Sequence, residues 1–126
     1  MGFLWVAVGG AIGSMMRFGL SLLLAPADAA HSFPLATLSA NLLGSFGLGL
    51  VFVLAAERSW FGSELRLLLG TGVMGGFTTY STFNLESLAM IQDASWGRAG
   101  IYVAATWLLC LAGGLLGLGL GRLLQA

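Results

Sequence analysis

The sequence predicts an all-α membrane protein with four transmembrane helices. Of its 126 residues, 58% are hydrophobic and only 8% are charged, a composition far from that of soluble globular domains. The apolar residues form four runs, each long enough for a helix that crosses a hydrocarbon core of about 30 Å. In lipid, backbone polar groups have no water to bind, which favours helices over an open sheet. We therefore expect a single four-helix transmembrane domain over residues 1–126.

We expect the helices over residues 3–24, 35–56, 65–92 and 98–121. The first of them contains Gly9 and Gly13, one helical turn apart, a spacing that lets another helix approach closely. It also contains Arg17, the one arginine well inside an apolar run. Arg17 could attract anions into a vestibule, or it could extend toward the interface and bond helix-end carbonyls; the second interpretation is favoured.

The second and fourth expected helices each carry polar residues at a spacing of four, which places them on one helix face. The two stripes are Thr37, Asn41 and Ser45 in the second helix, and Tyr102, Thr106 and Cys110 in the fourth. A single hydroxyl in a membrane helix can bond the carbonyl one turn back and then indicates nothing. Stripes on several helices are better explained by a shared polar pathway.

The third expected helix, 65–92, combines a further stripe with residues that propagate a helix poorly. Thr78, Thr82 and Glu86 repeat the spacing of four. The segment 75–83 contains two glycines and several β-branched residues. Two interpretations are open from this pattern: a broken helix whose unpaired carbonyls could coordinate a cation, or a continuous helix with a glycine kink.

The polar residues of these helices favour a small anion. Hydroxyl groups, the Asn41 amide and the ring edges of Phe77, Tyr80 and Phe83 all present partial positive charge. Such neutral donors can replace a hydration shell, whose loss costs tens of kcal/mol by the Born estimate, without binding the ion too tightly for release. The role of Glu86, whose carboxylate would repel an anion, stays open.

Four crossings place both termini on one side of the membrane, where Arg58, Arg66 and Arg122 are also expected; Arg98 is expected on the other side. This charge bias is weak, so the chain could insert in both orientations. Four thin, glycine-rich helices also enclose little space alone. We therefore hypothesise an antiparallel dimer.

Three segments resemble the Fluc (CrcB) family of fluoride channels. GVMGGFTTYSTF at 72–83 is similar to the family signature, GGAIGSMMRF at 9–18 to its first helix, and ATLSANLLGS at 36–45 to its second. Their order and spacing agree with the family over nearly the whole chain. The resemblance implies a fluoride-selective channel that exports fluoride passively, as a dual-topology antiparallel homodimer in the inner (plasma) membrane.

The resemblance also implies the site residues. It implies that the third helix is broken, and that a structural sodium ion at the dimer interface would be held by the backbone carbonyls of Gly75 and Thr78 in this break. The residues implied for the fluoride pore are Asn41, Tyr80, Ser81, Thr82, Phe83, Tyr102, Thr106 and Cys110, with Glu86 and Arg17 at the vestibule. Tyr80 stands where the family usually has phenylalanine, and Cys110 where serine is common, so both are departures.

Other classes fit less well. A small multidrug-resistance-type cation exporter needs a glutamate in its first helix, and this one has Arg17 and no acid. A haem-anchoring subunit needs axial histidines, and His31 is the only histidine. The sequence offers no pair of a histidine and a nucleophile that would suggest an enzyme. Its net charge of zero does not indicate a nucleic-acid-binding surface.

Overall fold

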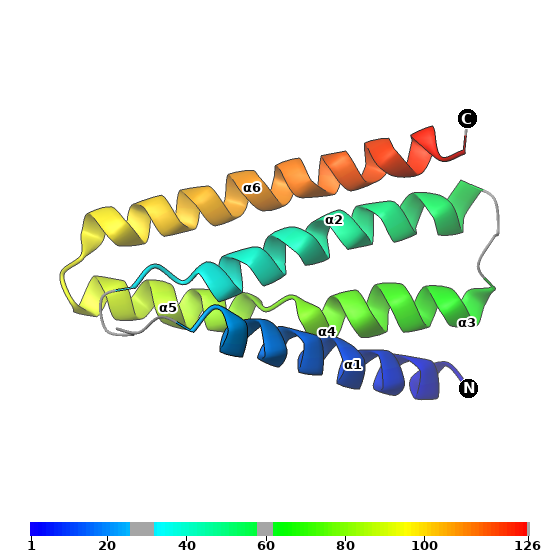
Figure 1. Cartoon of the computed structure of the whole chain (residues 1–126), viewed down its shortest axis with the longest axis horizontal. Coiled ribbons are helices and arrows are strands. Elements are labelled where there is room, and N and C mark those ends of the chain that lie inside the picture. Colours follow the sequence, from blue (N-terminus) through cyan, green and yellow to red (C-terminus); the bar gives the residue numbers. More distant parts are fainter. Residues whose placement is uncertain (26–31, 58–61, 126) are drawn as a thin grey trace.

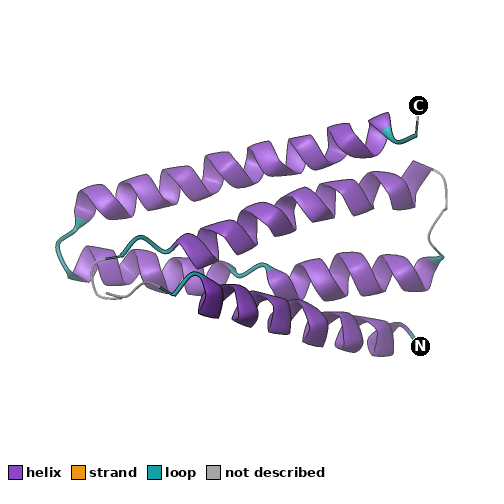
Figure 2. Ribbon diagram, viewed as in Figure 1, coloured by secondary structure: helices purple, strands orange, loops and turns teal. Residues whose placement is uncertain are grey.

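The computed structural model describes residues 1–25, 32–57 and 62–125, and within these ranges every regular element is helical. The elements are α1 (Gly2–Leu23), α2 (Leu35–Glu57), α3 (Ser63–Arg66), the π-helix η1 (Leu67–Met74), α4 (Gly75–Phe77), α5 (Tyr80–Gln92) and α6 (Trp96–Leu123). Figure 2 shows short loops between α4 and α5 and between α5 and α6. The predicted all-α class is therefore confirmed for the described residues.

Among the described residues, three helices are long and apolar enough to cross a membrane: α1, α2 and α6. Their bounds agree with the predicted ranges to within two residues, although α6 begins at Trp96 and so includes residues expected in a turn. The remaining predicted crossing, the third along the chain at 65–92, is made of α3, η1, α4 and α5 in succession. Both termini lie at the same end of the bundle (Figure 1), as four crossings require.

The third predicted helix is broken rather than merely kinked. α4 ends at Phe77, Thr78 and Thr79 are extended, with ψ of 155° and 110°, and α5 begins at Tyr80. The helix therefore loses its backbone hydrogen bonding in the middle of the crossing. The π-helical turns of η1, just before the break, were not predicted, because no residue pattern in this segment distinguishes them from α-helical ones.

The helices pack as two close pairs, α1 with η1 and α4, and α2 with α6 (Figure 1). Glycines make this possible: a Cβ at Gly13 would overlap the carbonyl oxygen of Val73, and one at Gly117 would overlap that of Phe46. α5 packs on the N-terminal half of α6, where Leu38, Met90, Ala99 and Tyr102 form the buried apolar cluster.

Large apolar side chains cover much of the outside of the bundle. Phe3, Met15, Phe52, Trp107 and Leu116 are all at least half exposed. Such a surface is unfavourable in water but suits contact with lipid or with another apolar subunit. This surface and the long apolar helices indicate a multi-pass membrane protein.

Candidate functional site

The helix break is held open by one side chain of α2. The Asn41 carbonyl oxygen Oδ1 accepts a hydrogen bond from the Thr79 amide at 2.7 Å, and Asn41 Nδ2 donates to the Thr79 carbonyl at 3.1 Å. The buried Asn41 amide thus satisfies both backbone groups of the residue at which the helix is interrupted.

Thr79 also begins the next helix. Its hydroxyl oxygen accepts from the Thr82 amide at 3.3 Å, in the position of an N-cap, and donates to the Thr82 hydroxyl at 2.9 Å. On the other side of the break, the Thr78 hydroxyl donates to the Met74 carbonyl at 3.0 Å. Threonine at both positions therefore supports the extended backbone with side-chain hydrogen bonds.

Several backbone carbonyls lose their helical partners at the break, among them those of Gly75 and Thr78. In a continuous helix, the Gly75 carbonyl would accept from the Thr79 amide, but that amide donates to Asn41. The Thr78 carbonyl would accept from the Thr82 amide, which donates to the Thr79 hydroxyl instead. These are the two carbonyls that the family resemblance implies as sodium ligands, and free carbonyl oxygens suit a hard cation.

Arg17 lies on α1, the helix that packs against η1 and α4. Its Nε donates to the Gly76 carbonyl at 3.4 Å, so it binds a carbonyl near the end of α4. This contact agrees with the structural interpretation of Arg17. Arg17 lines neither the groove that holds Asn41 and Phe83 nor the smaller pocket beside Glu86.

A groove of about 700 Å³ runs between α2, the break, α5 and α6. Polar and aromatic residues from all three predicted stripes line it: Asn41, Ser45, Thr78, Tyr80, Phe83, Thr106 and Cys110. Apolar residues complete its walls, among them Leu48, Val103 and Trp107. The structure therefore brings residues that are up to 69 positions apart, Asn41 and Cys110, to one surface.

Within the groove, the Thr106 hydroxyl is buried and has no hydrogen-bond partner among the described residues. A buried hydroxyl without a partner is costly, commonly about 1–3 kcal/mol, and calls for an explanation. The Tyr80 and Phe83 rings lie at the same groove, with centroids 5.7 Å apart and planes inclined at 49°. The Tyr80 ring is 77% exposed.

A second cluster lies beyond Phe83, toward the end of the bundle where α6 begins. The Glu86 carboxylate accepts from the Thr37 hydroxyl at 2.8 Å and from the Tyr102 hydroxyl at 2.6 Å. Tyr102 is fully buried, and its ring lies 5.2 Å from the ring of Phe83. Phe83 therefore connects the groove with this carboxylate cluster.

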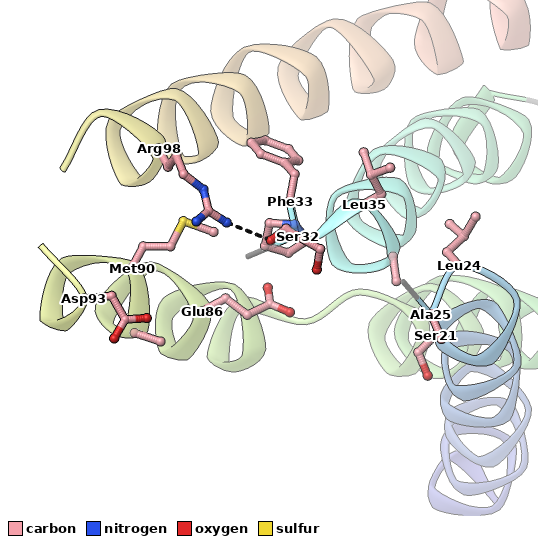
Figure 3. Close-up of a pocket in the computed structure, with 13 residues that line it drawn as sticks. Ser21, Leu24, Ala25, Ser32, Phe33, Leu35, Glu86, Met90, Asp93 and Arg98 are labelled. Carbon is pink, nitrogen blue, oxygen red and sulfur yellow. Dashed lines mark hydrogen bonds between the residues drawn. The ribbon is translucent and has the colours of Figure 1, made fainter. Parts of the chain in front are cut away.

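Glu86 also faces a smaller pocket of about 260 Å³ at this end of the bundle (Figure 3). Ser32 and Phe33, Asp93 and Arg98 contribute to its walls. In Figure 3, Arg98 reaches from α6 across the pocket to the Ser32 carbonyl, which accepts from Arg98 Nη2 at 3.0 Å. The lining of this pocket thus includes two carboxylates, those of Glu86 and Asp93, and the guanidinium of Arg98.

The structure gathers most of the predicted site residues, but not all. Ser81 is exposed and Thr82 bonds to Thr79, and neither lines the groove. Gly75 is exposed at the break. Sequence reasoning missed two features: Asn41 as the clamp of the break, for which no local signal exists, and Thr79 as the N-cap, which a threonine three residues before Thr82 could have suggested.

Known proteins resemble this chain over almost its whole length. The model of the family "CrcB-like protein, Camphor Resistance (CrcB)" matches residues 4–118. A protein of Roseiflexus sp. (strain RS-1) named "Fluoride-specific ion channel FluC" is 43% identical over 124 residues, covering 98% of this chain and 99% of its own. Proteins of the same name from Sorangium cellulosum and Thermus thermophilus are 43% and 44% identical over 122 and 119 residues, covering 95% and 94% of their own lengths.

Proposed function

Because the chain belongs to the CrcB family, whose relatives are named fluoride-specific ion channels and not enzymes, we propose that it conducts fluoride passively across a membrane. The observation that carries this proposal is the groove with the unpartnered Thr106 hydroxyl. The Thr106 oxygen is buried in the groove wall, so a small anion passing along the groove would accept its hydrogen bond once the side chain turned toward the groove.

The other donors at the groove suit the same ion. Ser45 contributes a hydroxyl, and Tyr80 and Phe83 contribute the positive edges of their rings. Each is neutral, so together they can replace part of the hydration shell of fluoride without the tight binding that a buried arginine would give. The proposed conduction path follows Phe83, Thr106 and Cys110.

The groove is open on one side, which supports a pore completed by a second copy of the chain. We propose an antiparallel, dual-topology homodimer, with one pore on each side of the interface. Weak arginine bias across the predicted topology supports insertion in both orientations. Closing the groove with another subunit would also cover exposed side chains such as Trp107 and Tyr80.

The carbonyls of Gly75 and Thr78 are the proposed sodium ligands, one pair from each subunit. Their lack of helical partners supports this proposal. A bound sodium ion would supply a fixed positive charge at the interface. Asn41 contributes by keeping the Thr79 amide away from Gly75.

We place Glu86 at the vestibule, at one end of the proposed conduction path. An unrestrained carboxylate would repel fluoride, but here its two oxygens accept from Thr37 and Tyr102. These hydrogen bonds disperse part of the negative charge and hold the group beside Phe83. Mouths at both ends of such a pore would open to water on either side of the inner (plasma) membrane, where we place this multi-pass protein.

Fluoride efflux from liposomes that contain the purified protein tests the function, with chloride-loaded liposomes as the control. A fluoride channel releases fluoride and retains chloride. The rival function, proton-coupled export of organic cations, would instead give uptake of a cationic dye driven by a pH gradient and no fluoride release. Equal release of both halides would contradict the proposed selectivity.

A further inference from the structure

The segment just before α2 touches the carboxylate cluster at the end of the bundle. The Phe33 and Tyr102 rings are nearly perpendicular, with centroids 5.4 Å apart and planes at 86°. This T-shaped arrangement is one of the favourable geometries for aromatic pairs. Phe33 is partly buried against the apolar cluster around Tyr102.

Arg98 fixes the same segment from the other side. Its guanidinium Nη2 donates to the Ser32 carbonyl at 3.0 Å, which joins the start of α6 to the residue that precedes Phe33. The Phe33 carbonyl accepts from the Leu35 amide at 2.8 Å, and α2 starts there. Phe33 is therefore anchored on both sides, by Arg98 through Ser32 and by the first turn of α2 (Figure 3).

We infer that Phe33 and Arg98 are positioning residues for Glu86, acting through Tyr102. Phe33 and Phe83 contact the Tyr102 ring from two directions, at centroid distances of 5.4 and 5.2 Å. The ring so held directs its hydroxyl to the Glu86 carboxylate at 2.6 Å. This inference rests on the proposed fluoride path, because it assigns these residues an effect on ion movement past Glu86.

Loss of this support has a defined physical consequence. If Phe33 is truncated, Tyr102 gains room to move, and its hydrogen bond to Glu86 weakens. Glu86 then keeps only the Thr37 hydroxyl, and its less compensated carboxylate repels an approaching anion. The expected result is slower fluoride movement, by about threefold to tenfold for the loss of one aromatic pair.

A different role for Arg98 must be separated from this one. Arg98 and Asp93 both line the small pocket, so Arg98 could act on fluoride by its charge alone. In that case Arg98→Gln would slow efflux, most strongly at low ionic strength, and Phe33→Ala would have no effect. Positioning instead predicts that both variants slow efflux and that their combination is less than multiplicative.

The experiment compares fluoride efflux from liposomes for wild type, Phe33→Ala, Phe33→Tyr and Arg98→Gln, each alone and in a Tyr102→Phe background. We expect Phe33→Ala to slow efflux by about threefold to tenfold, Phe33→Tyr to retain the wild-type rate, and Phe33→Ala to have no further effect when Tyr102 has lost its hydroxyl. Full activity of Phe33→Ala, or an equal loss in both backgrounds, would overturn the inference. Phe33→Leu, which keeps apolar volume but no ring edge, replaces Phe33→Ala if the latter does not fold.

A second readout does not depend on conduction. Unfolding temperatures in detergent for the Phe33→Ala and Tyr102→Phe pair form a double-mutant cycle. Positioning predicts that the two changes are coupled, whereas additive shifts would contradict it. If wild type releases no fluoride but the pair is coupled, the proposed function fails and the contact between the residues stands; if wild type conducts and the pair is additive, only the positioning inference fails.

Discussion

Asn41 and Thr79 pair through both of their polar groups: the Asn41 side-chain amide accepts from the Thr79 backbone amide and donates to its carbonyl. The Asn41 side chain of α2 thereby supplies the hydrogen bonds that neighbouring helical turns would otherwise give to the Thr79 backbone. This pair explains how a helix can be interrupted in the middle of a membrane crossing, where no water would otherwise satisfy the backbone.

Substitution of Asn41 tests this clamp. Asn41→Ala leaves the Thr79 amide and carbonyl buried without partners, which we expect to cost about 2–4 kcal/mol and to lower the unfolding temperature in detergent clearly. Asn41→Asp keeps the acceptor for the Thr79 amide but sets a second oxygen against the Thr79 carbonyl and buries a negative charge unless it is protonated, so it should also destabilise the protein, less at acidic than at neutral pH. Equal stability of Asn41→Ala and wild type would show that the break does not depend on this side chain.

Close packing of α1 on η1 depends on Gly13. A Cβ there would overlap the Val73 carbonyl oxygen, so Gly13→Ala must push the two helices apart, at a cost of about 1–3 kcal/mol. Gly19→Ala is the matched control on the same helix, because no atom lies within 4 Å of its Cβ position. Size-exclusion profiles and thermal stability in detergent should deteriorate for Gly13→Ala alone. A destabilised Gly19→Ala with a normal Gly13→Ala would contradict the packing seen here.

The Tyr80 and Phe83 rings at the groove should differ in how much they contribute to fluoride conduction. Phe83 contacts Tyr102 and lines the groove, whereas Tyr80 is largely exposed and its hydroxyl has no hydrogen bond shown within the described residues. We expect Tyr80→Phe to leave fluoride efflux unchanged and Phe83→Ile to abolish it, because isoleucine has no positive ring edge. The reverse order of effects in the liposome assay would count against the proposed path.

Removal of sodium tests the proposed cation site. If the carbonyls of Gly75 and Thr78 hold sodium, purification and efflux in a large organic cation should reduce fluoride release several-fold, and added sodium should restore it. Potassium, which is larger, should restore it less well. Unchanged efflux after exhaustive sodium removal would contradict a structural sodium ion. Stability of the dimer without sodium, measured on the same sample, separates loss of assembly from loss of conduction.

Much of the fold could be predicted because it follows from composition and period. The apolar runs of α1, α2 and α6 are long and uninterrupted, so their positions agree with the predicted ranges. The spacing of four in Asn41 and Ser45, and in Thr106 and Cys110, placed residues on common faces that now line one groove. Local periodicity is sufficient for such features because a helix face is defined by the chain alone.

The remaining features depend on contacts between helices, which the local pattern does not contain. From residues 75–83 alone, a break and a kink were equally open; the outcome depends on Asn41, 38 positions away from Thr79. The role of Glu86 stayed open for the same reason, since its partners Thr37 and Tyr102 lie on two other helices. The role of Phe33, just before α2, could not be predicted because it depends on the contact between its ring and the Tyr102 ring.

Substitution of Thr106 tests most directly whether neutral hydrogen-bond donors in the groove bind fluoride as it passes. The Thr106 hydroxyl is buried, lacks a partner within the described chain and lies beside Phe83 and Cys110. Thr106→Val has nearly the same shape without the hydroxyl, and Thr106→Ser keeps the hydroxyl without the methyl group. The measurement is the rate of fluoride efflux from liposomes at equal protein content. We expect Thr106→Val to slow efflux by about tenfold, since a hydrogen bond to a charged partner contributes roughly 1.5–3 kcal/mol, and Thr106→Ser to conduct like wild type. Wild-type efflux by a folded Thr106→Val protein would contradict the account.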